Sequence, residues 1–115
     1  MPDRALILKE PWASKVVSGE KTVELRTMKT NKIGKEIYIA KAGTKTLIGK
    51  VTIDKCVLLS QEEIQALEPY HFGGTYVDTL KGKKAYGWFL KNALAFENPI
   101  PYPHPQGAQI WVVLS

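Results

Sequence analysis

Three charged side chains in one short segment are the first candidates for chemistry in this chain. Residues 20–26 alternate between polar and apolar side chains, a pattern typical of a β-strand. In such a strand Lys21 shares the inward face with the apolar Val23, whereas Glu24 and Arg26 share the opposite face. We therefore expect a lysine at the mouth of an apolar face and a carboxylate–guanidinium pair on the other face.

Each of these side chains has a chemical role and a structural alternative. Loss of water around Lys21 disfavours its charged form, so this lysine can act as a base or as a phosphate ligand; alternatively, its ammonium group extends into solvent. Glu24 can accept a hydrogen bond from the amino group of a base, and Arg26 can bind a phosphate or a base edge through two hydrogen bonds. Alternatively, the two form a surface ion pair worth about 0–1 kcal/mol. Thr22 lies on the same predicted face as Glu24 and Arg26.

The segment before this strand is predicted to be a short helix over residues 11–18. Pro11 suits the first turn of a helix, and Gly19 follows at the position where a left-handed residue ends one. Trp12 is predicted to anchor this helix in the core, and stacking on an unpaired base, worth on the order of 1–3 kcal/mol, is the alternative. Lys9, just before the helix, is either a phosphate contact or a solvated charge.

The remainder of the chain is mainly β in its pattern. A second short helix is predicted after Ser60, because Ser60 and Glu63 have the spacing of a capping box, and Pro69 is predicted to end it. Residues 70–84 are predicted to be irregular. Further strands are predicted over residues 5–8, 36–40, 47–59, 86–97 and 109–114, and an extended loop over the proline-rich residues 99–107.

These elements predict an α+β fold, mainly β, with about six strands and two short helices. Many short strands in a small chain favour a closed or nearly closed barrel, because closure removes exposed sheet edges. A length of 115 residues is typical of one domain, so residues 1–115 are expected to form a single domain.

Positive charge is concentrated in the first half of the chain. The net charge is +5, and residues 1–55 carry 12 Lys or Arg against 6 Asp or Glu, whereas residues 56–115 carry 4 against 5. A basic half attracts polyanions, so nucleic acids and phosphorylated ligands are candidate partners. The alternative is a solvated surface whose lysines serve solubility.

The sequence offers few ligands for a metal. Cys56 is the single cysteine, and with only His71 and His104 beside it no zinc-type cluster is expected, so neither a metal nor a cofactor is predicted. The N-terminus lacks a signal-peptide pattern, and no apolar run approaches the roughly 20 residues of a membrane span. A cytoplasmic protein without a membrane partner is therefore expected.

Residues 9–13 (Lys-Glu-Pro-Trp-Ala) and 19–26 (Gly-Glu-Lys-Thr-Val-Glu-Leu-Arg) together resemble the ASCH family. The hallmark of that family is Gly-x-Lys-x-x-Glu-x-Arg directly after a short helix. Residues 86–88 (Tyr-Gly-Trp), 99–101 (Pro-Ile-Pro) and 107–111 also resemble it, so the likeness covers most of the chain.

The resemblance implies a PUA-like β-barrel with a cleft beside it, where the motif residues gather. The family is associated with RNA binding, and some members with transcription coactivation. Some relatives are enzymes, either amidohydrolases of acetylated cytidine or nucleases. The amidohydrolase relatives have a threonine nucleophile where this chain has Glu24. The resemblance therefore implies a similar cleft and a matching lysine, Lys21, but it does not imply that nucleophile.

Two main functions are consistent with these residues. The first is a module that binds RNA or a nucleotide, in which Lys21 and Arg26 contact phosphate while Glu24 reads a base or orients Lys21. The alternative is a small hydrolase of a nucleoside amide or of RNA, with Lys21 and Glu24 as acid–base groups. A protein-interaction domain is a third alternative that no residue supports directly. The predicted ligand-binding residues are Lys9, Trp12, Lys21, Thr22, Glu24 and Arg26.

Overall fold

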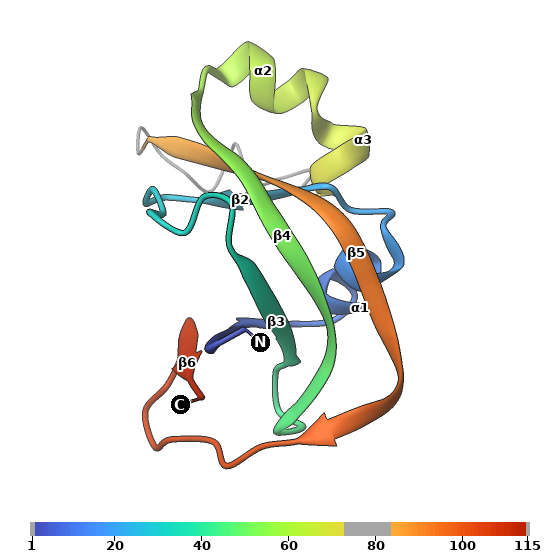
Figure 1. Cartoon of the computed structure of the whole chain (residues 1–115). Helices are drawn as coiled ribbons and strands as arrows, with labels where there is room; N and C mark the ends of the chain where they lie inside the picture. Colours follow the sequence, from blue (N-terminus) through green and yellow to red (C-terminus); the bar gives the residue numbers. More distant parts are fainter. Residues whose placement is uncertain (1, 73–83, 115) are drawn as a thin grey trace.

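The computed structural model describes residues 2–72 and 84–114, which form a curved six-stranded sheet with helices packed against it (Figure 1). The elements, in chain order, are β1 (Arg4–Leu8), α1 (Trp12–Ser18), β2 (Val23–Arg26), β3 (Glu36–Lys41), β4 (Thr46–Leu59), α2 (Gln61–Ala66), α3 (Glu68–His71), β5 (Ala85–Pro101) and β6 (Trp111–Val113). The strand order is β2-β5-β4-β3-β1-β6, so the sheet is a half-barrel with β2 and β6 at its edges. The predicted α+β, mainly β fold of about six strands is confirmed.

The curvature of the sheet comes from its two longest strands. β4 and β5 pair antiparallel along most of their lengths, and the register shifts at three places, the first between Leu47 and Gly49. Such irregularities insert an extra residue in one strand and bend it, which turns a flat ladder into a half-barrel. β1 pairs in parallel with β3, whereas β2 pairs antiparallel with β5. β2 therefore lies at one edge of the sheet, beside a strongly bent strand.

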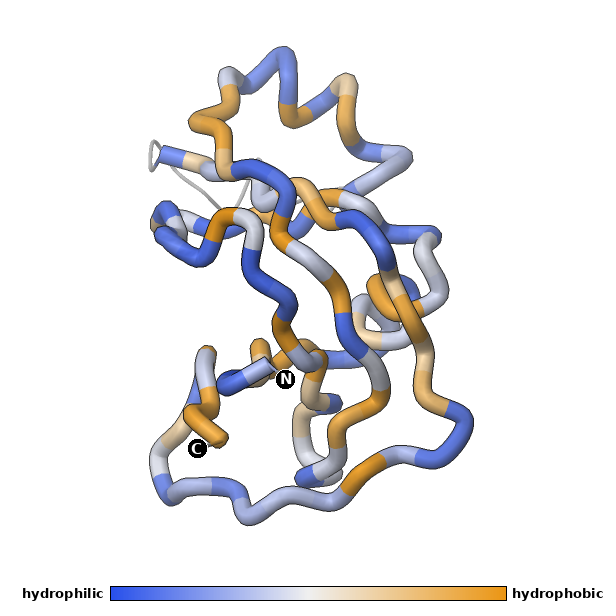
Figure 2. The backbone as a smooth tube through the Cα atoms, viewed as in Figure 1, coloured by the Kyte–Doolittle hydropathy of each residue, from blue (hydrophilic) through white to orange (hydrophobic). Residues whose placement is uncertain are grey.

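The main core lies between α1 and the sheet. Val16 and Val17 of α1 pack with Trp88 of β5 in one buried cluster. Figure 2 shows hydrophobic and hydrophilic residues alternating along β4, as expected for a strand with one buried face. Gly49 lets α1 approach β4 closely, because a Cβ atom at this position would lie 2.6 Å from Cγ1 of Val17. The helix that precedes the motif strand is thus fixed directly on the sheet.

Local sequence signals define the end of α1 and the start of α2 as predicted. Gly19 follows α1 with a φ of 87°, and its N–H donates to the carbonyl of Val16 at 3.1 Å. This conformation is the left-handed one that glycine adopts without strain. At the start of α2, Ser60 Oγ accepts from the N–H of Glu63 at 3.1 Å, and Glu63 Oε1 accepts from the N–H of Ser60 at 2.9 Å. The predicted capping box is therefore confirmed.

Pro69 does not end the second helix, which corrects one prediction. α2 ends at Ala66, and Pro69 occupies the first turn of a third helix, α3. A proline is tolerated there because the first turn of a helix has no use for its missing N–H. The described residues therefore contain three short helices rather than two.

Several predicted boundaries also move. The motif strand begins at Val23 rather than at residue 20, and the closing strand is confined to Trp111–Val113. β5 continues to Pro101, so the predicted extended loop over residues 99–107 begins as strand. Of the predicted irregular segment 70–84, residues 73–83 lie outside the described residues.

Candidate functional site

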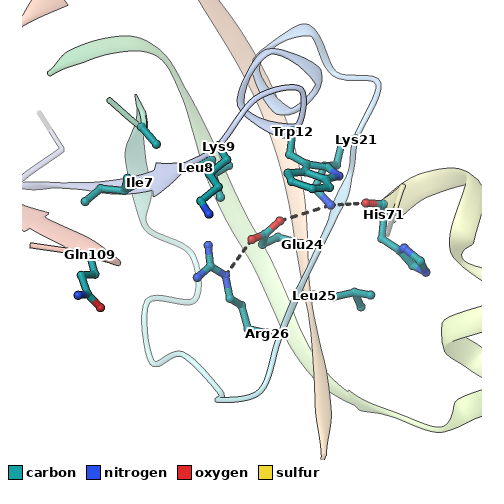
Figure 3. A pocket seen from close by; sticks show the side chains of 11 residues that line it. Ile7, Leu8, Lys9, Trp12, Lys21, Glu24, Leu25, Arg26, His71 and Gln109 are labelled. Atoms are coloured by element: carbon teal, nitrogen blue, oxygen red, sulfur yellow. Dashed lines mark hydrogen bonds and ion pairs between the residues drawn. The ribbon is translucent and has the colours of Figure 1, made fainter. Parts of the chain in front are cut away.

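A pocket of about 400 Å³ lies beside the motif strand (Figure 3). It is bounded by the end of β1, the start of α1 and all of β2 except its first residue, together with single residues from α3 and from the segment before β6. Its volume is in the range of small-molecule sites in proteins. The lining residues are Ile7, Leu8, Lys9, Trp12, Lys21, Glu24, Leu25, Arg26, Ala42, His71 and Gln109.

Lys21 is buried at the inner end of this pocket, with 3% of its surface exposed. Its Nζ donates to the carbonyl of Val23 at 2.8 Å and to the carbonyl of His71, and it lies 3.3 Å from Oε1 of Glu24. An ammonium group has three N–H donors, so these three acceptors occupy all of them. The protein therefore holds the Lys21 ammonium in one fixed position.

Glu24 bridges the two cations of the motif. Its Oε1 faces Lys21, and its Oε2 accepts a hydrogen bond from Nε of Arg26 at 2.8 Å. Only 8% of Glu24 is exposed, so this carboxylate is far more buried than a surface ion pair. The guanidinium carbon of Arg26 also lies 5.6 Å from the centre of the Trp88 ring, within cation–π range. Arg26 is thus oriented by a carboxylate on one side and by an aromatic ring on another.

The contact between Lys21 and Glu24 corrects the prediction that they lie on opposite faces of one strand. That prediction assumed that the alternation of a strand already applied at Lys21. Because β2 begins at Val23, Lys21 lies in the irregular segment before the strand, where side-chain direction does not follow the pleat. Its side chain folds back toward the carboxylate instead.

Burial lowers the pKa of Lys21 below its ordinary value, because an ammonium group loses hydration inside the protein. The carboxylate of Glu24 opposes this shift, and the positive charge of Arg26 adds to it. The balance of these effects still favours a lowered pKa, a property that recurs at functional sites.

Trp12 lies at the pocket rather than deep in the core, which corrects the prediction of a core anchor. The residue is 37% exposed and lines the pocket, while its indole N–H donates to the carbonyl of Phe72 at 3.3 Å. Its position is fixed by the hydrogen bond, and a part of its ring surface stays accessible. A tryptophan held in this way offers a flat apolar surface at the pocket wall.

The other two predicted ligand-binding residues lie in different places. Lys9 is exposed at the pocket and has no ion-pair partner in the described part of the chain. Thr22 is not among the described residues that line the pocket. Its main chain joins neighbouring segments, because its N–H donates to the carbonyl of Tyr70 at 3.1 Å and its carbonyl accepts from the N–H of Leu90 at 2.8 Å.

Sequence reasoning missed the lining residues that come from remote segments. Gln109 reaches the pocket from the segment before β6, and Ala42 from the turn after β3. The buried ring of His71 has its Nε2 2.7 Å from the carbonyl of Ile64, while its own carbonyl accepts from Lys21. No local pattern in the sequence marks these residues, because only the tertiary fold brings their segments to β2.

Neither a metal centre nor a membrane segment was found among the described residues. No three His, Cys, Asp or Glu side chains in this part of the chain gather closely enough to hold a metal ion. None of the described helices is sufficiently long and apolar to cross a membrane.

The fold and the site together define a small half-barrel domain with a cationic pocket beside its edge strand. Residues 6–100 match the family model of the ASCH domain, and the chain therefore belongs to the ASCH domain family, as its motifs suggested. Comparison with curated proteins found no match.

Two similar solved structures are those of an ASCH protein from Zymomonas mobilis and of a point mutant of it. The first has a TM-score of 0.77 at 23% sequence identity, covering 97% of this chain and 87% of the other. The mutant has a TM-score of 0.76 at 24% identity, covering 100% of this chain and 92% of the other. At this level of identity the likeness shows a shared fold.

Proposed function

We propose that the pocket binds a nucleotide, either free or as one unit of an RNA chain. The observation that carries this proposal is the placement of two cations whose charged ends point toward one another across the pocket, Lys9 and Arg26 (Figure 3). Like charges gathered around an open space favour an anion between them. Among the described residues, the lining holds three cationic side chains and one carboxylate, a formal excess of two positive charges that matches a phosphate group.

The remaining lining residues suit the rest of a nucleotide. The exposed ring surface of Trp12 can stack on a base, a contact worth on the order of 1–3 kcal/mol. The side chain of Gln109 offers both a donor and an acceptor for the edge of a base. Apolar side chains such as Leu8 and Leu25 line other parts of the wall, where the ligand would exclude water.

Within this proposal, the buried pair Lys21 and Glu24 positions Arg26. Glu24 accepts from Nε of Arg26, and in the described part of the chain the terminal nitrogens of the guanidinium have no acceptor, so they can bind a phosphate. Lys21 in turn holds the carboxylate of Glu24 in place. A guanidinium fixed before binding loses less side-chain entropy when the ligand arrives.

Titration calorimetry with the ribonucleoside monophosphates of A, C, G and U tests the proposal. Arg26→Gln removes a charged donor, so affinity should fall by about tenfold to a hundredfold. The matched control is Arg4→Gln, because Arg4 is exposed to a similar extent and pairs with Asp3 away from the pocket lining. If folded Arg26→Gln protein binds every nucleotide as well as Arg4→Gln protein does, the pocket is not a phosphate site.

A hydrolase of a nucleoside amide or of RNA is the second candidate function. It is favoured by the buried Lys21, because the pKa of this lysine is lowered and its Nζ lies 3.3 Å from the carboxylate of Glu24. For Lys21 to accept a proton it must first lose one, and all three of its hydrogens are engaged by the protein. Assays of product release from N-acetylated nucleosides and from RNA decide this candidate: absence of turnover by the wild-type protein removes it.

A further inference from the structure

We propose that residues 27–35, called here the basic loop, form a phosphate-binding surface that extends the pocket along a single-stranded polynucleotide. This inference rests on the proposed function, because it assigns a polymer, rather than a free nucleotide, to the same site. The basic loop follows Arg26 directly and lies beside β2, where it appears in cyan in Figure 1. A strand with one nucleotide in the pocket would meet this loop next.

All charged residues of the basic loop are positive. It contains Lys29, Lys32 and Lys35 and no acidic residue, and its trace is mostly hydrophilic in Figure 2. None of these lysines has an ion-pair partner among the residues that the structure describes. By contrast, Lys50 pairs with Glu36 at 3.1 Å and Lys91 pairs with Asp54 at 3.1 Å. Three uncompensated charges next to the pocket favour a polyanion over a small neutral ligand.

The basic loop also has two exposed apolar side chains next to its lysines. Met28 is 49% exposed and Ile33 is 45% exposed, although neither is polar. Side chains of this kind can pack against the faces of unpaired bases or against ribose, while the lysines contact phosphates. Met28 lies beside Lys29 and Ile33 beside Lys32, so each of these apolar side chains has a lysine as its neighbour in the sequence.

Hydrogen bonds fix both ends of the basic loop. The indole N–H of Trp88 donates to the carbonyl of Met28 at 3.1 Å, and the N–H of Gly34 donates to the carbonyl of Ile53 at 2.7 Å. Within the loop, the N–H of Lys32 donates to Oγ1 of Thr30 at 3.1 Å. A loop held in this way needs little further ordering when it binds.

The lysines lie within reach of a strand that leaves the pocket. Lys29 is three positions after Arg26 in the chain, so their Cα atoms are at most about 11 Å apart. Lys32 follows three residues later, at most about 22 Å from Arg26. The proposal therefore places one phosphate of the strand at Arg26 and neighbouring phosphates at the basic loop.

The test uses fluorescence anisotropy with labelled single-stranded RNA of roughly 12 nucleotides, and with DNA of the same sequence, over roughly 50 to 200 mM salt. In the loop variant, Lys29, Lys32 and Lys35 are replaced by Gln. Each phosphate contact on a single strand contributes about 0.7 to the slope of log affinity against log salt, so the slope should fall by about 2. Affinity at the lowest salt should fall at least about tenfold.

The control variant removes the same formal charge elsewhere. Lys45, Lys50 and Lys91 are replaced by Gln, and none of them lines the pocket or belongs to the basic loop. The proposal expects the control variant to have a slope of log affinity against log salt that differs from the wild-type slope by no more than about 0.7, the contribution of one phosphate contact. An equal loss of slope in both variants would mean that only net charge matters, and it would overturn the proposal.

Binding of mononucleotides separates this inference from the proposed function. Both proposals expect the loop variant to bind nucleoside monophosphates as the wild-type protein does, because the pocket is unchanged. If mononucleotides bind but neither RNA nor DNA binds more tightly, the basic loop proposal fails and the pocket proposal stands. If the wild-type protein binds neither mononucleotides nor polymers, both fail. The comparison of RNA with DNA decides which polymer the surface prefers.

Discussion

Glu24→Gln measures how much the contacts of Glu24 with Lys21 and Arg26 contribute to the stability of the protein, because it removes the negative charge between these two cations. The side chain of glutamine is nearly isosteric and keeps one oxygen acceptor, so the shape of the pocket wall is preserved. What remains is the buried ammonium of Lys21 close to the guanidinium of Arg26, with no carboxylate between them. The expected result is a marked fall in the free energy of unfolding.

The distances set the size of this effect. At an effective dielectric constant of about 20, charges 3.3 Å apart attract by about 5 kcal/mol, which is the gross attraction between Lys21 and Glu24. The hydration that Glu24 loses on burial offsets part of that attraction, and glutamine has no charge to desolvate. Removing one partner of a buried pair typically costs about 3–5 kcal/mol. Because Arg26 is partly exposed and can turn toward water, we expect about 3 kcal/mol.

A double-mutant cycle isolates the contact between Lys21 and Glu24. Lys21→Met keeps the aliphatic stem and removes the charge, so a protein with both substitutions no longer buries an uncompensated ammonium. The two effects should therefore not add, and the coupling energy should be about 2–3 kcal/mol. Urea unfolding monitored by circular dichroism gives all the required free energies. The matched control is the cycle of Lys50→Met with Glu36→Gln, an exposed pair whose coupling should stay below about 1 kcal/mol.

A coupling energy near zero for Lys21 and Glu24 would refute this reasoning. It would mean that the ammonium and the carboxylate do not interact in the folded protein, and that Glu24 does not hold Arg26 through a network. A fall in stability for Glu24→Gln alone would not be sufficient support, because a buried polar group can destabilise by itself. The cycle is therefore the decisive measurement.

Two further predictions concern packing and pH. Gly49→Ala places a methyl group against Val17 and the carbonyl of Leu94, so it should destabilise the protein by about 1–3 kcal/mol in urea; unchanged stability would contradict the close approach of α1 to β4. Burial lowers the pKa of Lys21, so the unfolded chain binds this proton more tightly than the folded one. The stability of the wild-type protein relative to Lys21→Met should then rise as pH increases from the lowered pKa of Lys21 toward its ordinary value of 10.5, and a constant difference over that window would contradict the shift.

The parts of the fold that sequence predicted well are those with local causes. The end of α1 at Gly19 depends on one left-handed residue, and the start of α2 depends on two side chains within one turn, Ser60 and Glu63. Pro69 shows the limit of such signals, because a proline is equally compatible with the residue after a helix and with the first turn of the next one. Only the packing of α3 against its neighbours selects the second alternative.

The candidate site was predicted in its residue types but not in its arrangement. Lys21, Glu24 and Arg26 were expected from the motif, yet the contact between Lys21 and Glu24 depends on where the strand begins, and alternation alone does not fix that residue. Gln109 was not expected, because it lies far along the chain and reaches the pocket only through the pairing of β6 with β1. Burial of a charged group likewise follows from tertiary packing, which no short pattern encodes.

The network also explains why a pocket proposed to bind an anion contains a carboxylate. Without Glu24, the cations of the motif would repel one another, and Arg26 would turn toward solvent to relieve that repulsion. With Glu24, Nε of Arg26 is occupied, and no other described residue accepts a hydrogen bond from the remaining guanidinium donors, which are therefore available to a ligand. Lys21 has no donor left for direct contact with a ligand. Its positive charge attracts an anionic ligand at a distance, and its contact with Glu24 helps to hold Arg26 in place. The motif thus combines one cation that can face the ligand with a buried pair that fixes its direction.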